Sequence, residues 1–203
     1  GNTVQLFDVS NSFAPQSMGQ FAASLGDTVK RAGIYLGKIY LPNGVMLAID
    51  KESAEVVRVY TPERSRGTTS DIAMAGSRVL AAAGPYGAVY HDYAEANWNT
   101  RAIPEGGWAQ SVNSVHLDDS NAYLSLADAN RVVAMNAAQL HESTDAAQHI
   151  VFDGVAASQL VGSRYLLAAS ESNLIHLASK QDLTQATTLE LPVGEDIVSM
   201  AAH

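Results

Sequence analysis

Short apolar stretches recur along the whole chain, and turns rich in Gly, Asn, Asp or Ser separate them. In the segment GKIYLPNGVMLAID, from Gly37 to Asp50, one apolar stretch ends at Pro-Asn-Gly and a second follows at once. Apolar runs bounded by such turn residues are typical of β-strands joined in hairpins, and no helical spacing is sustained. The pattern predicts an all-β protein.

The same hairpin pattern occurs four times, with copies that begin at Gly37, Ser77, Ser120 and Ser163 and are therefore 40, 43 and 43 residues apart. A further apolar strand precedes and follows each copy, which gives four strands per repeat. A period near 40 residues with four strands is that of a β-propeller blade. A β-sandwich is the alternative, because its strands also recur at short intervals, but it has no reason to keep this period.

The two ends of the chain predict one shared blade. Residues 1–22 have the pattern of a third and a fourth strand, and residues 195–203 have that of a first strand. We therefore expect one domain, residues 1–203, that forms a five-bladed β-propeller closed by its terminal strands, so that no sheet edge is left open. A second strand for the closing blade is not found, so either that blade has three strands or the chain is a piece of a longer propeller. The expected blades are about 28–68, 69–110, 111–154 and 155–194, with the closing blade formed by 195–203 plus 1–27.

Composition narrows the classes of partner. The chain has 203 residues, of which 47% are hydrophobic, enough for a sizeable core. Its net charge of −9 repels the phosphate backbone, so we expect no nucleic-acid partner. No apolar run reaches the roughly 18 residues of a membrane-spanning helix, so no membrane span is expected. The chain has no cysteine, which excludes disulfides, thiolate metal sites and a cysteine nucleophile.

One N-terminal segment carries a family resemblance. The stretch VQLFDVSNSFAPQSMGQ resembles the LVIVD-type β-propeller repeat of bacterial proteins, in which an apolar strand ends in an Asp-Val-Ser-Asn turn followed by Pro and then Gly. The resemblance implies a periplasmic, cell-surface or secreted propeller and supplies no catalytic residue. The matching residues are Leu6, Phe7, Asp8, Val9, Ser10, Asn11, Pro15 and Gly19.

A search for chemistry finds no catalytic or metal motif. The six histidines are scattered, and none has the spacing of a metal site, so neither a metal nor a cofactor is expected. His91 and Asp92 are adjacent in a predicted strand and so point to opposite faces. The segments Gly84–Gly87 and Asp128–Asn130 are interpreted as turns, since the first lacks the Lys and helix of a phosphate loop and the second has too few oxygen ligands for Ca²⁺.

Binding residues are expected in loops on one face of the propeller. The loops that join each outermost strand to the next blade gather there with the turns between second and third strands. Trp108 is the first candidate, because Trp and Arg are enriched where binding energy concentrates, although an indole that merely covers core is the alternative. We call the full candidate set the loop rim: Arg64, Arg66, Glu105, Trp108, Gln110, Asp153, Glu195 and Asp196.

The sequence thus favours a non-enzymatic binding or protein-interaction module that uses the loop rim, with a protein, small-molecule or carbohydrate ligand. A carbohydrate-active hydrolase is the alternative, with Glu105 and Glu195 as a carboxylate pair. Against it, Asp71 is the one acid predicted on the inner strands, where a hydrolase channel needs several. A second alternative is a structural repeat array within a larger surface protein.

Overall fold

The structure is a computed structural model of the chain. It describes residues 3–8, 11, 13–22, 33–36, 38–43, 45–50, 52–53, 56–60, 71–85, 87–92, 94, 101–103, 111–141, 149–170, 173–192 and 200. In these residues the regular structure is antiparallel β-sheet, apart from one 3-10 helix, η1 (Ala137–His141). The predicted all-β class is confirmed. None of the helical structure in the described ranges is long and apolar enough to span a membrane.

Four sheets of four strands each follow one another along the chain, and the strands of each sheet are paired in sequence order. We call these sheets blades 1 to 4. Blade 1 is β3 (Gly33–Tyr35), β4 (Lys38–Asn43), β5 (Val45–Asp50) and β6 (Val56–Tyr60); blade 2 is β7 (Asp71–Ala75), β8 (Arg78–Ala82), β9 (Ala88–Asp92) and β10 (Arg101–Ile103). Blade 3 is β11 (Val112–Leu117), β12 (Asn121–Leu126), β13 (Arg131–Asn136) and β14 (His149–Asp153); blade 4 is β15 (Gln159–Gly162), β16 (Tyr165–Ala169), β17 (Leu174–Ser179) and β18 (Asp182–Glu190).

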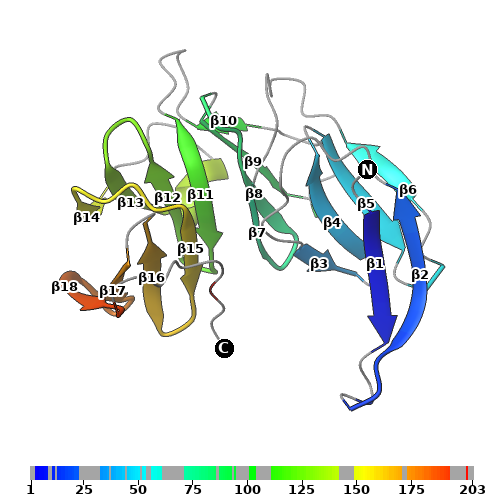
Figure 1. Cartoon of the computed structure of the whole chain (residues 1–203). Coiled ribbons are helices and arrows are strands. Elements are labelled where there is room, and N and C mark those ends of the chain that lie inside the picture. Colours follow the sequence, from blue (N-terminus) through cyan, green and yellow to red (C-terminus); the bar gives the residue numbers. More distant parts are fainter. Residues whose placement is uncertain are drawn as a thin grey trace.

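The blades stand side by side, with the first strand of each nearest to the first strand of the next (Figure 1). Strand β7 contacts β3 on one side and β11 on the other, and β11 in turn contacts β15. A two-stranded sheet of β1 (Thr3–Asp8) and β2 (Gln16–Ala22) lies at the end of the array opposite blade 4 (Figure 1). Among the described residues there is no fifth four-stranded sheet.

Strand alternation explains why the central strands are apolar on both faces. In β12, Leu124 packs in a core shared with blade 2, whereas the adjacent Tyr123 packs in a core shared with blade 4. In β13, Val133 belongs to the first core and Val132 to the second. Because successive side chains point to opposite faces, a blade between two others buries both. Such strands therefore appear in the sequence as nearly continuous apolar runs.

The two segments interpreted as turns are turns. Gly84 and Gly87 have φ angles of 55° and 84°, and the Gly87 N–H donates to the Gly84 carbonyl at 3.1 Å. Asn130 closes the β12 to β13 turn with φ 48°, a conformation that Asn tolerates better than most residues. Gly84 also pairs with Val112 at the start of β11, which joins blade 2 to blade 3.

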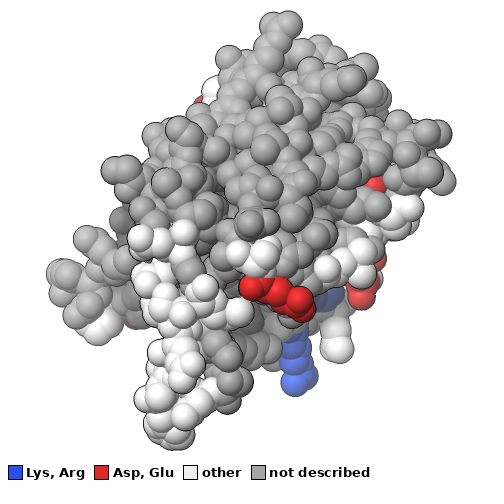
Figure 2. All heavy atoms as spheres, turned by 90° about the vertical axis from the view of Figure 1, so that its right-hand side faces the viewer, with Lys and Arg blue, Asp and Glu red and all other residues white. Residues whose placement is uncertain are grey.

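The β1–β2 hairpin presents apolar side chains to solvent. Phe13 is 99% exposed, and Phe7 and Met18 are each 50% exposed. The Asn11 side chain accepts the Phe13 N–H at 3.1 Å, which holds the turn between the two strands. Figure 2 shows this end of the molecule, where most of the described atoms belong to uncharged residues.

Candidate functional site

Polar side chains of the first strands form hydrogen bonds from blade to blade. Asp71 on β7 is fully buried, and its Oδ2 accepts the Ser114 hydroxyl at 2.6 Å and the Val115 N–H at 3.0 Å. The Ser114 Oγ, on β11, accepts the Leu160 N–H of β15 at 2.9 Å. These contacts link blades 2, 3 and 4 through groups that water does not reach. We call them the inner hydrogen-bond chain.

The inner hydrogen-bond chain continues beyond blade 4. Gln159 on β15 accepts the Met200 N–H through its Oε1 at 2.9 Å. The relation is the same one that Ser114 has with Leu160 and Asp71 has with Val115: a side chain on one first strand accepts a backbone N–H from the next segment around the array. Met200 is thus bonded to blade 4 in the way that Leu160 is bonded to blade 3.

This bonding limits the chemistry of the acid singled out on the inner strands. The second oxygen of Asp71 accepts the Ile72 N–H at 3.0 Å, so both carboxylate oxygens bind structural donors. A general acid needs a proton and an open path to substrate, and Asp71 is buried at the joint between two blades. Within the described ranges no group of three or more His, Asp or Glu side chains is placed to hold a metal ion.

The turn from β11 to β12, at one end of the strands of blade 3, carries a cluster of charges. Asp118 Oδ1 accepts the N–H groups of Ser120 and Asn121 at 2.9 and 2.7 Å, which fixes the turn. From blade 2, Arg78 donates to the carbonyl of Asp119 at 3.3 Å and to its carboxylate at 3.1 Å. The turn is thus held by a cation of the neighbouring blade.

Blade 4 holds the same turn from the other side. Lys180, in the turn between β17 and β18, lies with its Nζ 2.8 Å from Asp118 Oδ2 and 2.8 Å from His116 Nε2. The same ammonium lies 5.4 Å from the centre of the Tyr123 ring, and that ring stacks on His116 with centroids 5.7 Å apart. The Lys180 side chain is only 13% exposed. We call Lys180, His116, Asp118 and Tyr123 the interblade cluster.

A glycine on β15 allows Lys180 of blade 4 to approach His116 of blade 3. A Cβ atom on Gly162 of β15 would lie 2.7 Å from His116 Nε2 and 2.7 Å from Lys180 Cε. Carbon atoms at that distance overlap, so any larger residue at 162 pushes the lysine or the histidine away. A glycine therefore fits at position 162 because His116 and Lys180 lie so close to it.

Two pKa values reflect these surroundings. Burial raises the pKa of the Asp118 carboxyl, but the hydrogen bonds from Lys180, Asn121 and Ser120 outweigh that effect and bring the pKa below its ordinary 3.8. Burial, together with the charge of Asp118, raises the pKa of Tyr123 to about 12. Asp118 is therefore ionised and Tyr123 is protonated at neutral pH.

One residue of the predicted loop rim lies in the described part of the chain. Asp153, at the end of β14, pairs with Arg131, at the start of β13, with Nε 2.8 Å from Oδ1. The hydrogen bond and charge of Arg131 lower the pKa of Asp153 below its ordinary value. The pair lies at the same end of blade 3 as the contact of Asp128 with the Ser111 N–H. Outside the described residues lie Arg64, Arg66, Glu105, Trp108, Gln110, Glu195 and Asp196.

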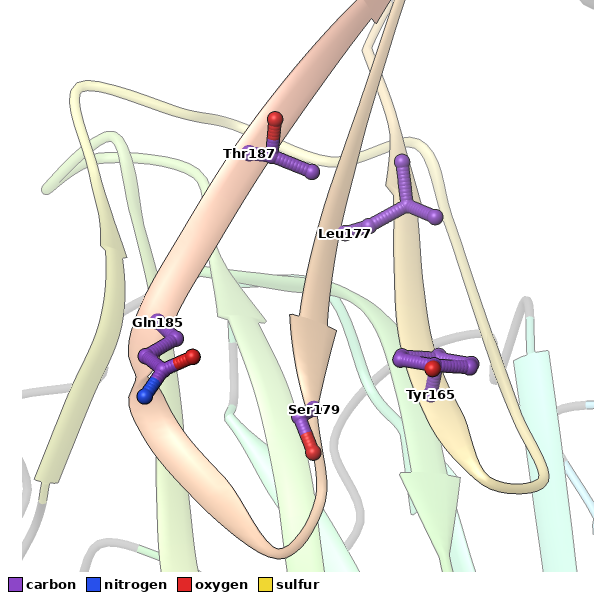
Figure 3. A pocket seen from close by; sticks show the side chains of 5 residues that line it. All are labelled: Tyr165, Leu177, Ser179, Gln185 and Thr187. Atoms are coloured by element: carbon purple, nitrogen blue, oxygen red, sulfur yellow. The ribbon is translucent and has the colours of Figure 1, made fainter.

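A hollow of about 280 Å³ lies on the outer strands of blade 4 (Figure 3). Its lining comes from one face of β16, β17 and β18, where Tyr165 is opposite Ser179 and Leu177 is opposite Thr187. The other face of the same strands, with Leu166 and Ala178, packs on blade 3. The hollow thus marks the side of blade 4 that turns away from blade 3. Its lining residues are Tyr165, Leu177, Ser179, Gln185 and Thr187.

The interblade cluster is what the sequence reasoning missed. His116 and Lys180 are 64 residues apart, and no spacing rule connects a strand histidine to a turn lysine of the next repeat. The position after the third strand gave no signal, because the other three repeats have Lys51, Tyr93 and Ala137 there.

Comparison with solved structures places this array in a known architecture. A chain of the mitotic checkpoint complex is similar with TM-score 0.65 and 14% identity, over 94% of this chain and 58% of that one. A chain of the COPII outer coat vertex has TM-score 0.67 and 15% identity, over 93% and 56%. Streptogramin B lyase has TM-score 0.61 and 10% identity, over 84% and 58%. All three have β-propeller folds.

The chain has a β-propeller-like fold. At these identities the likeness concerns the fold alone, and the chain spans less than two thirds of each of those three chains. No protein-family model matches the sequence, and no curated protein matches it.

Proposed function

We propose that this propeller is a non-enzymatic interaction module and that its partner is a protein. The observation that carries the proposal is the inner hydrogen-bond chain, in which Asp71 and Ser114 join neighbouring blades. The inner strands then serve to hold the array together, which leaves the loops to contact a partner. Two of the similar structures, moreover, are chains of multi-protein assemblies, the mitotic checkpoint complex and the COPII coat.

The proposed contact surface is the loop rim, and Trp108 is the residue of it that we expect to contribute most to binding. Trp and Arg are the residue types on which binding energy concentrates. The Arg131–Asp153 pair supports this location, because it places an exposed cation and an exposed anion at the same end of blade 3. Such a pair contributes little to folding and remains available to a partner's charges.

The array is proposed to close through its own termini into five blades. The contact of Met200 with Gln159 supports this arrangement, because it repeats the relation between the first strands of blades 2, 3 and 4. The hollow of blade 4 then lies where a closing blade packs. In keeping with the LVIVD-type resemblance, we place the protein outside the cytoplasm.

The test is site-specific photocrosslinking in cells of the source organism, with a photoreactive residue at Asp153 in an otherwise unchanged chain. We expect a protein adduct that Trp108→Ala abolishes. Gln181→Ala is the matched control, because Gln181 is exposed in the turn between β17 and β18, at the opposite end of the strands. An adduct of equal yield in Trp108→Ala and wild type contradicts the proposal, and so does one that Gln181→Ala removes equally.

A further inference from the structure

The contact between Lys180 and His116 fixes the protonation state of the histidine. An ammonium group has donors and no acceptor, and its Nζ lies 2.8 Å from His116 Nε2. For this contact to be a hydrogen bond, Nε2 must carry a lone pair and accept. His116 is therefore neutral in this arrangement, with its proton on Nδ1.

We propose that His116 and Lys180 form an acid-sensitive latch between blades 3 and 4, which is closed while His116 is neutral and released when His116 takes up a proton. Protonation turns Nε2 from an acceptor into a donor, so two donors then face each other. It also places a second positive charge within hydrogen-bond distance of the ammonium, where repulsion is strong because water is largely excluded. A histidine ordinarily changes charge between about pH 5 and 8, which makes this contact sensitive to mild acid.

Among the described residues, the charged groups near His116 are already paired before the proton is added. Asp118, from the turn after β11, is an anion that binds Lys180 at 2.8 Å. Tyr123, from β12, presents a neutral ring. Arg78 of blade 2 adds a further cation behind the same turn, and its partner Asp119 has a carboxylate that is 96% exposed. When His116 is protonated, the three cations His116, Lys180 and Arg78 thus face two carboxylates, Asp118 and Asp119, among the described residues.

The packing forces this repulsion to act on the blades. The Lys180 side chain is 13% exposed and passes close over Gly162, where even a Cβ atom has no room. The ammonium thus has little room on the side of β15, and when it leaves His116 the turn between β17 and β18 loses a contact that holds it to blade 3. Tyr123 belongs to the core shared by these two blades, so the release begins to uncover that core.

Hydrogen–deuterium exchange of the full chain at pH 7.5 and pH 5.5 tests the latch, with rates corrected for the intrinsic effect of pH on exchange. In wild type we expect opening around residues 174–182 to be up to about tenfold more frequent at pH 5.5, because that is the increase that proton uptake by one histidine of ordinary pKa, about 6.5, allows between these two pH values. His116→Gln keeps an acceptor that does not titrate, so its opening should increase far less at pH 5.5 than that of wild type, with His176 of blade 4 as the remaining titrating group. His149→Gln is the matched control: His149 is exposed on β14 of the same blade and should leave the wild-type response intact.

Two outcomes overturn the latch: equal protection of wild type at both pH values, or a His116→Gln variant that responds to pH as wild type does. A second measurement applies even if His116→Gln folds poorly. Nitrogen NMR of the wild-type imidazole at pH 7.5 should show Nδ1 as the protonated nitrogen of His116, and a proton found on Nε2 contradicts the proposal. The latch requires no partner, so its test is independent of the proposed function.

Discussion

The side chains of Asp71 and Ser114 meet at 2.6 Å between the first strands of blades 2 and 3, and solvent reaches neither. Each also binds a backbone N–H of the next blade, Val115 for Asp71 and Leu160 for Ser114. A buried donor that loses its acceptor costs the full free energy of removing it from water. This pair thus connects neighbouring blades, and its removal should destabilise two of them.

Ser114→Ala should lower the free energy of unfolding by about 1–3 kcal/mol, because the Leu160 N–H loses its acceptor and Asp71 loses a donor. Asp71→Asn should have a similar effect, because the amide nitrogen is a donor where Val115 and Ser114 also donate. Urea denaturation measures both. Ser120→Ala, in an exposed turn, is the control and should change nothing. Wild-type stability in Ser114→Ala would rule out the structural role.

The fold could be predicted from the sequence because the apolar runs and the residue types of the turns indicate the same strands and turns in the repeats. Gly84, Gly87 and Asn130 stand where the chain needs positive φ angles, so the turns could be predicted from residue type alone. Burial of both faces, as at Tyr123 and Leu124, leaves a continuous apolar run that still separates strand from turn.

The contacts between blades could not be predicted from the sequence, for a physical reason. Asp71 was predicted on an inner strand, but its partner depends on how far one sheet is rotated and shifted against the next. The same holds for Lys180 and His116, which meet only because Gly162 allows their elements to approach. The hydrophobic pattern of the sequence indicates which residues form a strand. The packing of one sheet against the next determines which side chains of two strands touch.

Gly162→Ala should destabilise the joint between blades 3 and 4. The added methyl group would lie 2.7 Å from His116 Nε2 and from Lys180 Cε, and such overpacking typically costs about 1–3 kcal/mol. Because part of the clash is with a flexible lysine, Gly162→Ala combined with Lys180→Ala should lose less stability than the two single effects together. Urea denaturation of the four proteins gives the coupling. Strict additivity would contradict a clash at this position.

His176 should make blade 4 less stable in mild acid. Burial lowers the pKa of its imidazole below the ordinary 6.5, and its Nδ1 lies 3.0 Å from the Thr188 hydroxyl. A histidine that binds a proton less readily when folded has no effect well above pH 6.5 and destabilises as the pH falls through 6.5 toward the folded pKa. In a His116→Gln background, which removes the pH response of the latch, thermal midpoints from pH 8 to pH 5 should fall more steeply with His176 than with His176→Gln. Parallel curves would show that His176 is not involved.

The proposed closing strand can be tested at Met200, whose N–H donates to Gln159. Met200→Pro removes the N–H that Gln159 accepts at 2.9 Å, so we expect a loss of about 1 kcal/mol in the free energy of unfolding. Met200→Ala keeps the N–H and serves as the control for the lost side chain. If residues around 200 form the first strand of a closing blade, Met200→Pro should also increase hydrogen exchange in β15, whereas Met200→Ala should not. Equal stability and exchange in the two variants would mean that the contact does not help to close the array, and the five-bladed arrangement would lose its main support.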